Sequence, residues 1–121
     1  MTFSKEKIMI ADIKVNELQW QPHPIFKDLL IKKLLTHEKD HVDLSIVMVK
    51  VKKGSQIPAH VHEQDDIVYH LEGSCKMWVE NEGIFDLKPG SFMRIPARVK
   101  HQPREIHEDL LVFDIFYPHL Y

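Results

Sequence analysis

Residues 54–73 read GSQIPAHVHEQDDIVYHLEG, and this stretch decides how the whole chain is interpreted. It places three histidines and four acidic residues between two glycines, together with the apolar residues of a strand. These polar groups either face water or converge on a ligand. His60 and His62 are two residues apart, so on a strand both imidazoles point to one face and can reach one metal ion. Asp66 follows after an even step and keeps that face if the strand continues.

The overall composition is that of one globular domain. The chain has 121 residues, of which 44% are hydrophobic and 28% charged. We therefore expect a single domain over residues 1–121. A formal net charge of -2 gives no electrostatic reason to expect nucleic acid or an anionic membrane as a partner. No apolar run reaches the length of a membrane span.

Two features of the chain bear on its compartment. Cys75 is the single cysteine and has no partner for an internal disulfide, which favours a reducing environment. The N-terminal stretch MTFSKEKIMIAD lacks a signal-peptide core. The default expectation is a cytoplasmic protein.

Short segments rich in β-branched and aromatic residues, separated by glycine and proline, predict an all-β fold. We predict strands at about 42–52, 56–61, 66–72, 75–80, 83–88, 91–95 and 109–117. Residues 80–83 predict a hairpin loop and residues 88–91 a tight turn. Many short, evenly spaced strands favour a sandwich or a barrel.

Residues 25–35, IFKDLLIKKLL, are compatible with two structures. Phe26, Leu29, Leu30 and Leu34 fit one face of a helix, and residue propensities favour that helix. The same residues also fit an extended segment.

A fourth candidate ligand lies far along the chain. His101 stands in RIPARVKHQP, after a turn that Pro96 makes rigid. Only a sheet that closes on itself would bring His101 alongside His60 and His62.

With these spacings, residues 54–73 resemble the first motif of the cupin family, G-x5-H-x-H-x3-4-E-x6-G. Gly54, His60, His62 and Gly73 match it at the required spacing, and Asp66 stands in place of the glutamate.

Residues 90–105 resemble the second cupin motif, G-x5-P-x-G-x2-H-x3-N. Gly90, Pro96 and His101 match, whereas Arg98 replaces a turn glycine and Glu105 replaces the asparagine. The two motifs together cover residues 54 to 105.

The resemblance implies a double-stranded β-helix, a small jelly-roll barrel with one divalent transition-metal ion inside one mouth. The implied ligands are His60, His62, Asp66 and His101, with a three-histidine site and a surface Asp66 as the alternative. Three imidazoles and one carboxylate suit Mn, Fe, Co, Ni, Cu or Zn, and the sequence does not choose among them. The resemblance also implies a homodimer, and an extended rather than helical segment at residues 25–35.

Two titratable residues are candidates for catalysis. His70 shares a strand face with Asp66 and Val68, so it is either an acid, base or substrate contact, or a core histidine with a backbone partner. Met77 and Val79 are expected to wall the same pocket. Asp114 interrupts the apolar run of residues 109–117. It either faces inward, where burial would raise its pKa, or points outward near the barrel mouth.

The C-terminal residues resemble a pattern of the pectin- and alginate-degradation cupins that linearise 4,5-unsaturated monouronates, D-x-F-x-P-x-R. Asp114, Phe116 and Pro118 match, and Leu120 stands where arginine is expected. The resemblance implies that Asp114 transfers the proton and that Phe116 shapes the pocket.

The missing arginine leaves the anchor of a substrate carboxylate open, and Arg94 or Arg98 could replace it only by facing the mouth. The predicted activity is metal-assisted proton transfer, a ketonisation or isomerisation of a small hydroxylated or carboxylated, sugar-acid-like molecule. A metal-dependent dioxygenase and a non-catalytic small-molecule or carbohydrate-binding protein are the alternatives. The remaining histidines have no motif support, and we expect solvated or capping roles for them: His23, His37, His41, His107 and His119.

Overall fold

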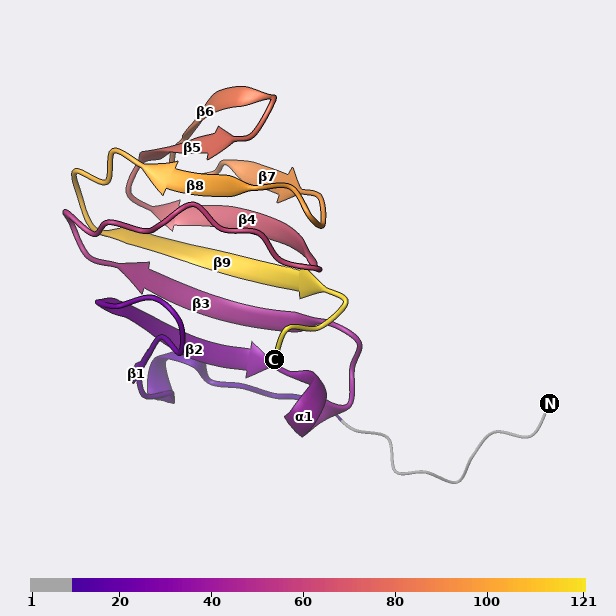
Figure 1. Cartoon of the computed structure of the whole chain (residues 1–121). Coiled ribbons are helices and arrows are strands. Elements are labelled where there is room, and N and C mark those ends of the chain that lie inside the picture. The colour runs from indigo at the N-terminus through magenta and orange to yellow at the C-terminus, as the bar shows by residue number, and fades with distance from the viewer. Residues whose placement is uncertain (1–9) are drawn as a thin grey trace.

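The computed structural model describes residues 10–121, which fold into two antiparallel sheets facing each other (Figure 1). Residues 1–9 belong to the stretch that lacks a signal-peptide core and lie outside the described residues. Within residues 10–121, no helix has both the length and the apolar character needed to cross a bilayer.

The larger sheet has six strands in the spatial order β1-β2-β3-β9-β4-β7. Their bounds are β1 Gln21–Pro22, β2 Leu29–Leu35, β3 Ser45–Val51, β9 Leu110–Tyr117, β4 Asp65–Glu72 and β7 Phe92–Ile95. The smaller sheet has the order β6-β5-β8, with bounds β6 Gly83–Leu87, β5 Cys75–Val79 and β8 His101–Arg104. The short helical turns are η1 Val15–Glu17 and α1 His37–Asp40. The predicted all-β jelly-roll fold is confirmed.

Residues 29–35 form strand β2, so the helix that propensity favours is wrong and the extended alternative is confirmed. The strand pairs with β3 in an antiparallel register in which Leu29 lies opposite Val51 and Ile31 opposite Val49. All four of these side chains are buried. The intrinsic helix preference of these residues is only about 0.5 kcal/mol per residue. Burial of their side chains against a neighbouring strand outweighs it.

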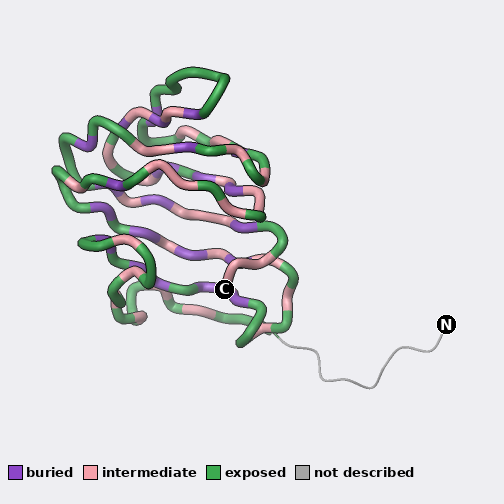
Figure 2. Tube along the Cα trace, viewed as in Figure 1, coloured by how far each residue is buried: buried purple, intermediate pink, exposed green. Residues whose placement is uncertain are grey.

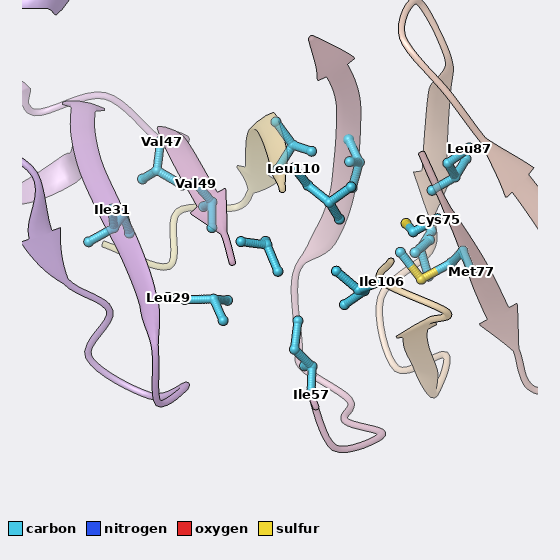
Figure 3. Packing of buried hydrophobic residues seen from close by; sticks show 14 of the residues in the cluster. Leu29, Ile31, Val47, Val49, Ile57, Cys75, Met77, Leu87, Ile106 and Leu110 are labelled. Atoms are coloured by element: carbon cyan, nitrogen blue, oxygen red, sulfur yellow. The ribbon is translucent and has the colours of Figure 1, made fainter. Parts of the chain in front are cut away.

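The core lies between the sheets and follows strand alternation. On β3, Val47, Val49 and Val51 are buried, whereas Met48 and Lys50 face outward, as predicted. Figure 2 shows the buried positions recurring along the central strands of the larger sheet. Figure 3 shows side chains of both sheets meeting in one cluster.

The two predicted turns are present. Residues 80–82 connect β5 to β6 as a hairpin loop. At residues 88–91 the Ser91 amide donates to the Lys88 carbonyl at 2.8 Å, and the Ser91 hydroxyl accepts from the Lys88 amide at 3.0 Å.

The strand predicted at residues 56–61 is wrong. This segment is irregular and crosses the front of the larger sheet, and its one β-bridge joins His60 to His101 (Figure 1). Pro58 lacks the amide proton that a ladder needs. Ile57 is nevertheless buried, so the segment closes the second layer with a side chain rather than with strand pairing.

Strand β8 was not predicted, and it contains Pro103, a residue type that central strands exclude. It lies at the edge of the smaller sheet and pairs with β5, where Pro103 stands opposite Met77. An edge position tolerates the missing amide donor, and β8 begins with His101 itself.

The two glycines of the first motif occupy their positions for different reasons. Gly73 has φ 79°, and a Cβ there would lie 2.2 Å from the Asp109 carbonyl oxygen. Gly54 has φ 80° and open space around it. Arg98, in the turn-glycine position of the second motif, adopts φ 65°, so the left-handed turn persists with an arginine. Its amide donates to the His62 carbonyl at 2.9 Å.

Candidate metal centre

Three imidazoles converge inside the barrel. His60 and His62 come from the irregular segment before β4, and His101 is the first residue of β8. The main chains of His60 and His101 exchange two hydrogen bonds of 3.0 Å, which brings the two motifs together. One potential ligand atom from each of the three rings lies within 4.8 Å of those of the other two.

Backbone carbonyls orient all three rings. Each Nδ1 lies 2.8–2.9 Å from a carbonyl oxygen two residues away in the chain. This contact fixes a proton on Nδ1 and leaves Nε2 as the lone-pair nitrogen that can face a cation. The irregular backbone around His60 and His62 therefore performs the alignment that a regular strand was expected to provide.

Aromatic side chains pack against two of these rings. The Phe26 ring centroid lies 4.9 Å from that of His60, and Phe116 meets the His62 ring edge-on at 5.5 Å. Such contacts limit rotation of the imidazoles and help to keep their Nε2 atoms converged.

Asp66 stands beside two of the three histidines. Its Oδ2 lies 3.7 Å from His62 Nε2 and 3.6 Å from His101 Nε2. Within the described residues, Asp66 Oδ1 and His101 Nε2 are buried and have no hydrogen-bond partner. Buried polar atoms of this kind are costly unless something satisfies them, and a cation would satisfy both. The donor set therefore fits a divalent transition-metal ion.

Asp114 and Asp66 form a pair of carboxyl groups in which the protonation of one depends on that of the other. Burial acts to raise the pKa of Asp66, but the neighbouring His101 and His62 rings and the Asp114 carboxyl group outweigh it and lower the pKa to about 2. Burial, followed by the charge of Asp66, raises the pKa of Asp114 well above its usual value. Two adjacent carboxyl groups cannot both ionise cheaply, so Asp66 carries the charge and Asp114 the proton.

Register explains why Asp114 points inward. It lies opposite Val47 of β3 and Val68 of β4, both of which are buried. Residues directly paired across a sheet share a face, so Asp114 continues the inward side of β9 that Val112 begins. Of the two orientations left open by the sequence, the structure has the inward one.

The histidines and Asp114 face a cavity of about 390 Å³. Of the four residues expected to wall it, Val68, Met77 and Phe116 line it, whereas Val79 does not. Most of its other lining side chains are apolar, among them Val49 and Val51. The polar groups are therefore concentrated near the candidate metal centre rather than spread over the walls.

His70 is buried and lines the same cavity. Its Nδ1 lies 3.4 Å from the Gly73 carbonyl oxygen, and burial lowers its pKa. It thus has the backbone partner of a core histidine together with the exposure to the cavity that a functional role requires. Its other ring nitrogen, Nε2, is the one through which it can reach a ligand.

Neither arginine suggested as an anchor for a carboxylate lines the cavity. Arg94 Nε donates to Asp65 at 2.8 Å, and Arg98 Nε donates to Glu63 at 2.8 Å. Both are exposed, so they brace the outer rim of the motifs.

His23 and Tyr121 are among the cavity residues that sequence reasoning missed. His23 has the capping role that was expected, because its Nδ1 accepts the amides of Ile25 and Phe26 at 3.1 and 3.2 Å. No motif marks either residue, and only the pairing of β1 with β2 and the path of the C-terminal residues bring them to the cavity. Elsewhere, the His37 and His119 rings stack at 3.9 Å.

Comparison with known proteins identifies the family. Residues 47–116 match the family model described as Cupin_2, Cupin domain. The chain is a cupin. This membership agrees with both motifs and with the jelly-roll topology.

Solved structures similar to this cupin include KdgF from Halomonas sp., with a TM-score of 0.71 and 29% identity over 85% of this chain and 90% of that one. The polyketide cyclase RemF from Streptomyces resistomycificus is similar in fold, with a TM-score of 0.74 and 18% identity over 90% of this chain and 80% of that one.

A similar curated sequence is quercetin 2,3-dioxygenase from Bacillus subtilis strain 168. It is 37% identical over 60 residues, which is 49% of this chain and 18% of the relative. The cupin described here therefore matches only a small part of that protein.

Proposed function

We propose that this cupin is a metal-dependent enzyme that catalyses proton transfer, as in ketonisation or isomerisation, on a small hydroxylated or carboxylated molecule resembling a sugar acid. The observation that carries the proposal is the placement of Asp114, an acid in an apolar strand, on the same cavity as three converging imidazoles. An acid and a candidate metal centre at one cavity are the two parts that such a reaction needs.

His60, His62 and His101 would hold the ion, with Asp66 as the fourth ligand. When bound, the ion would supply Lewis-acid chemistry, binding substrate oxygens and polarising a carbonyl next to the C–H bond that exchanges its proton. Mn, Fe, Co, Ni, Cu and Zn all suit this donor set.

Asp114 would be the proton-transfer residue. Burial and the neighbouring Asp66 charge raise the pKa of Asp114 and favour its protonated form, so its carboxyl group can donate to a substrate carbon and be reprotonated. His70 faces the same cavity and is the second residue able to move a proton. Val68, Met77 and Phe116 would limit the water around the reacting carbon.

The C-terminal pattern supports this substrate class, because Asp114, Phe116 and Pro118 match the cupins that linearise unsaturated monouronates. A similarity to KdgF at 29% identity over most of both chains is consistent with the proposal.

The test uses protein purified without oxygen and loaded with each of the six ions in turn. Unsaturated monouronates are supplied in D2O, and deuterium entering a carbon position is followed by NMR. Asp114→Asn, which keeps the shape of the protonated acid, should lower turnover by about 100-fold or more with unchanged metal content. Asp86→Asn is the matched control, because that carboxylate pairs with Lys76 and is exposed. Full activity of Asp114→Asn would remove its catalytic role.

A metal-dependent dioxygenase is the second candidate. The mostly apolar lining of the cavity and the 60-residue match to quercetin 2,3-dioxygenase favour this reaction. Oxygen uptake with an aromatic or diketone substrate, and no deuterium exchange, would support it. Tight ligand binding without either reaction would support a non-catalytic binding cupin.

A further inference from the structure

We propose that the phenol group of Tyr121 donates a hydrogen bond to a carboxylate of the ligand, at the end of the cavity that holds Asp114 and the candidate metal centre. The proposal rests on the proposed function, because it supplies a contact to a substrate carboxylate that Leu120 cannot make. Leu120 lines the cavity in the position where arginine is expected, and its side chain has no polar group. The proposal concerns ligand affinity and can be measured apart from catalysis.

The residues after β9 return to the metal end of the cavity. Beyond β9 the chain turns back along the larger sheet (Figure 1), and Tyr121 is among the residues that line the cavity. Its ring meets the Phe116 ring edge-on, with the two centroids 6.0 Å apart. Phe116 in turn meets the His62 ring edge-on at 5.5 Å. Tyr121 is therefore one aromatic ring away from a candidate metal ligand.

The register of β3 with β9 gives the same placement. Ser45, which is hydrogen-bonded to the main chain of Tyr121, lies opposite Phe116. Asp114 is two residues before Phe116, on the same face of β9. Because Asp114, Phe116 and Tyr121 all line the cavity, Tyr121 lies at the end that Asp114 and Phe116 occupy.

Contacts of the main chain and of the ring hold Tyr121 in place. The fully buried Ser45 hydroxyl accepts from the Tyr121 amide at 2.8 Å and donates to the Tyr121 main-chain oxygen at 3.0 Å. The His37 amide donates to the same oxygen at 2.9 Å. Lys33 Nζ lies over the ring, 4.7 Å from its centroid. Within residues 10–121, the hydrogen bonds of Tyr121 are all made by its main chain, so its phenol can bind a ligand.

The phenol is a hydrogen-bond donor at neutral pH. Burial, followed by the charges of Asp114 and Asp66, raises the pKa of Tyr121 to about 12, so the O–H keeps its proton. A carboxylate only accepts hydrogen bonds, and a bond to a charged acceptor is stronger than one to a neutral acceptor. When bound, the metal ion would offset the negative charge of Asp66.

The surroundings of the Tyr121 ring also favour an anionic ligand. Lys33 places a positive charge against the ring. In the described part of the chain, no acidic side chain lies within 4.0 Å of the Lys33 ammonium group. An unpaired cation next to the phenol favours a carboxylate over a neutral hydroxyl as the bound group.

The experiment measures ligand binding to the zinc-loaded protein by calorimetry. The probes are pentanoate, whose only oxygens are those of its carboxylate, and imidazole, which binds zinc and has no oxygen. We expect Tyr121→Phe to weaken pentanoate binding about fivefold or more, because the O–H donor is lost and the ring is kept. Imidazole binding and zinc affinity should stay at wild-type values, since neither uses the phenol.

Tyr117→Phe is the matched control. Tyr117 is the last residue of β9, is 55% exposed and does not line the cavity. Removing its phenol oxygen should therefore leave the binding of both probes unchanged. Thermal unfolding of Tyr121→Phe should stay close to wild type, because the Ser45 hydroxyl bonds only the main chain of residue 121.

Unchanged pentanoate binding in Tyr121→Phe would overturn the proposal, and so would an equal loss for both probes, which would mean that the metal centre itself had changed. Absence of measurable pentanoate binding to the wild-type protein would overturn it as well. These readouts are affinities, whereas the Asp114 test follows proton exchange, so the failure of either test leaves the other standing.

Discussion

Removing one imidazole from the candidate metal centre should abolish the stabilisation that a metal ion gives. His101 is the most informative position, because it is 2% exposed and its Nε2 has no partner among the described residues. We expect wild-type protein to gain stability on metal addition and His101→Ala to gain almost none.

The size of the effect follows from binding to the folded state alone. An ion present at 100 times its dissociation constant adds about 2.7 kcal/mol to the free energy of unfolding. For a domain of this size, that raises the unfolding temperature by about 10 °C. The shift should shrink to about 2 °C or less in His101→Ala, since two imidazoles and Asp66 bind an ion far more weakly.

The stability of the metal-free protein tests the metal centre less well than the stabilisation on metal addition does. Deleting a buried side chain costs about 2–4 kcal/mol, but removing an unpaired buried nitrogen returns about 1–3 kcal/mol. These two contributions oppose each other, so metal-free His101→Ala need not differ much from wild type. The difference between metal-free and metal-loaded protein is the quantity to compare.

The assay combines elemental analysis with thermal unfolding of chelator-stripped protein titrated with each of the six ions without oxygen. His60→Ala combined with His101→Ala should lose most bound metal. His107→Ala is the matched control, because that side chain is 81% exposed and lies outside the cavity. The assignment of the centre would be wrong if the double variant kept the wild-type metal stoichiometry and the same thermal shift.

Three further predictions concern packing, reactivity and assembly. Gly54→Ala should lower the free energy of unfolding by about 1 kcal/mol, because alanine is strained in the left-handed backbone conformation. Gly73→Ala should lower it by a further ~1–3 kcal/mol, because the new Cβ would also meet a carbonyl oxygen. Equal losses for the two variants in urea denaturation would contradict this. Burial raises the pKa of Cys75 to about 11, so iodoacetamide should label it at pH 8 only after unfolding, and rapid labelling of native protein would refute the prediction. The outer face of the larger sheet exposes the neighbouring Tyr69 and Phe92, and we expect a dimer by sedimentation at micromolar concentration; a strictly monomeric profile would count against it.

The two cupin motifs predicted the convergence of the histidines, although part of the physical reason was different. His60 and His62 were expected to share a face because strand residues alternate. They share it instead because carbonyl contacts orient each ring on an irregular segment. The spacing of the motifs therefore predicted the convergence of the histidines correctly, although the strand geometry assumed for His60 and His62 was wrong.

Two features could not be predicted from local sequence because they depend on how the strands pair. The direction of Asp114 depends on the register of β9 between β3 and β4. The placement of Lys33 depends on the pairing of β2 with β3, and propensity favoured a helix for these residues. The contacts that decide the direction of Asp114 are far away along the chain, whereas Lys33 pairs with the next strand.

The distribution of polar groups around the cavity restricts the ligand more than its volume does. The candidate metal centre and Asp114 lie together, and Val49 and Val51 are among the apolar walls that continue along β3 away from Asp114. A ligand hydroxyl held against those valines would lose its water without gaining a partner, at a cost of about 1–3 kcal/mol. A wholly apolar ligand would leave the histidine nitrogens without partners. The favoured ligand therefore has its oxygens at the end that meets the candidate metal centre and few hydroxyls on the part that lies against those valines. An unsaturated acid meets that requirement better than a fully hydroxylated sugar does.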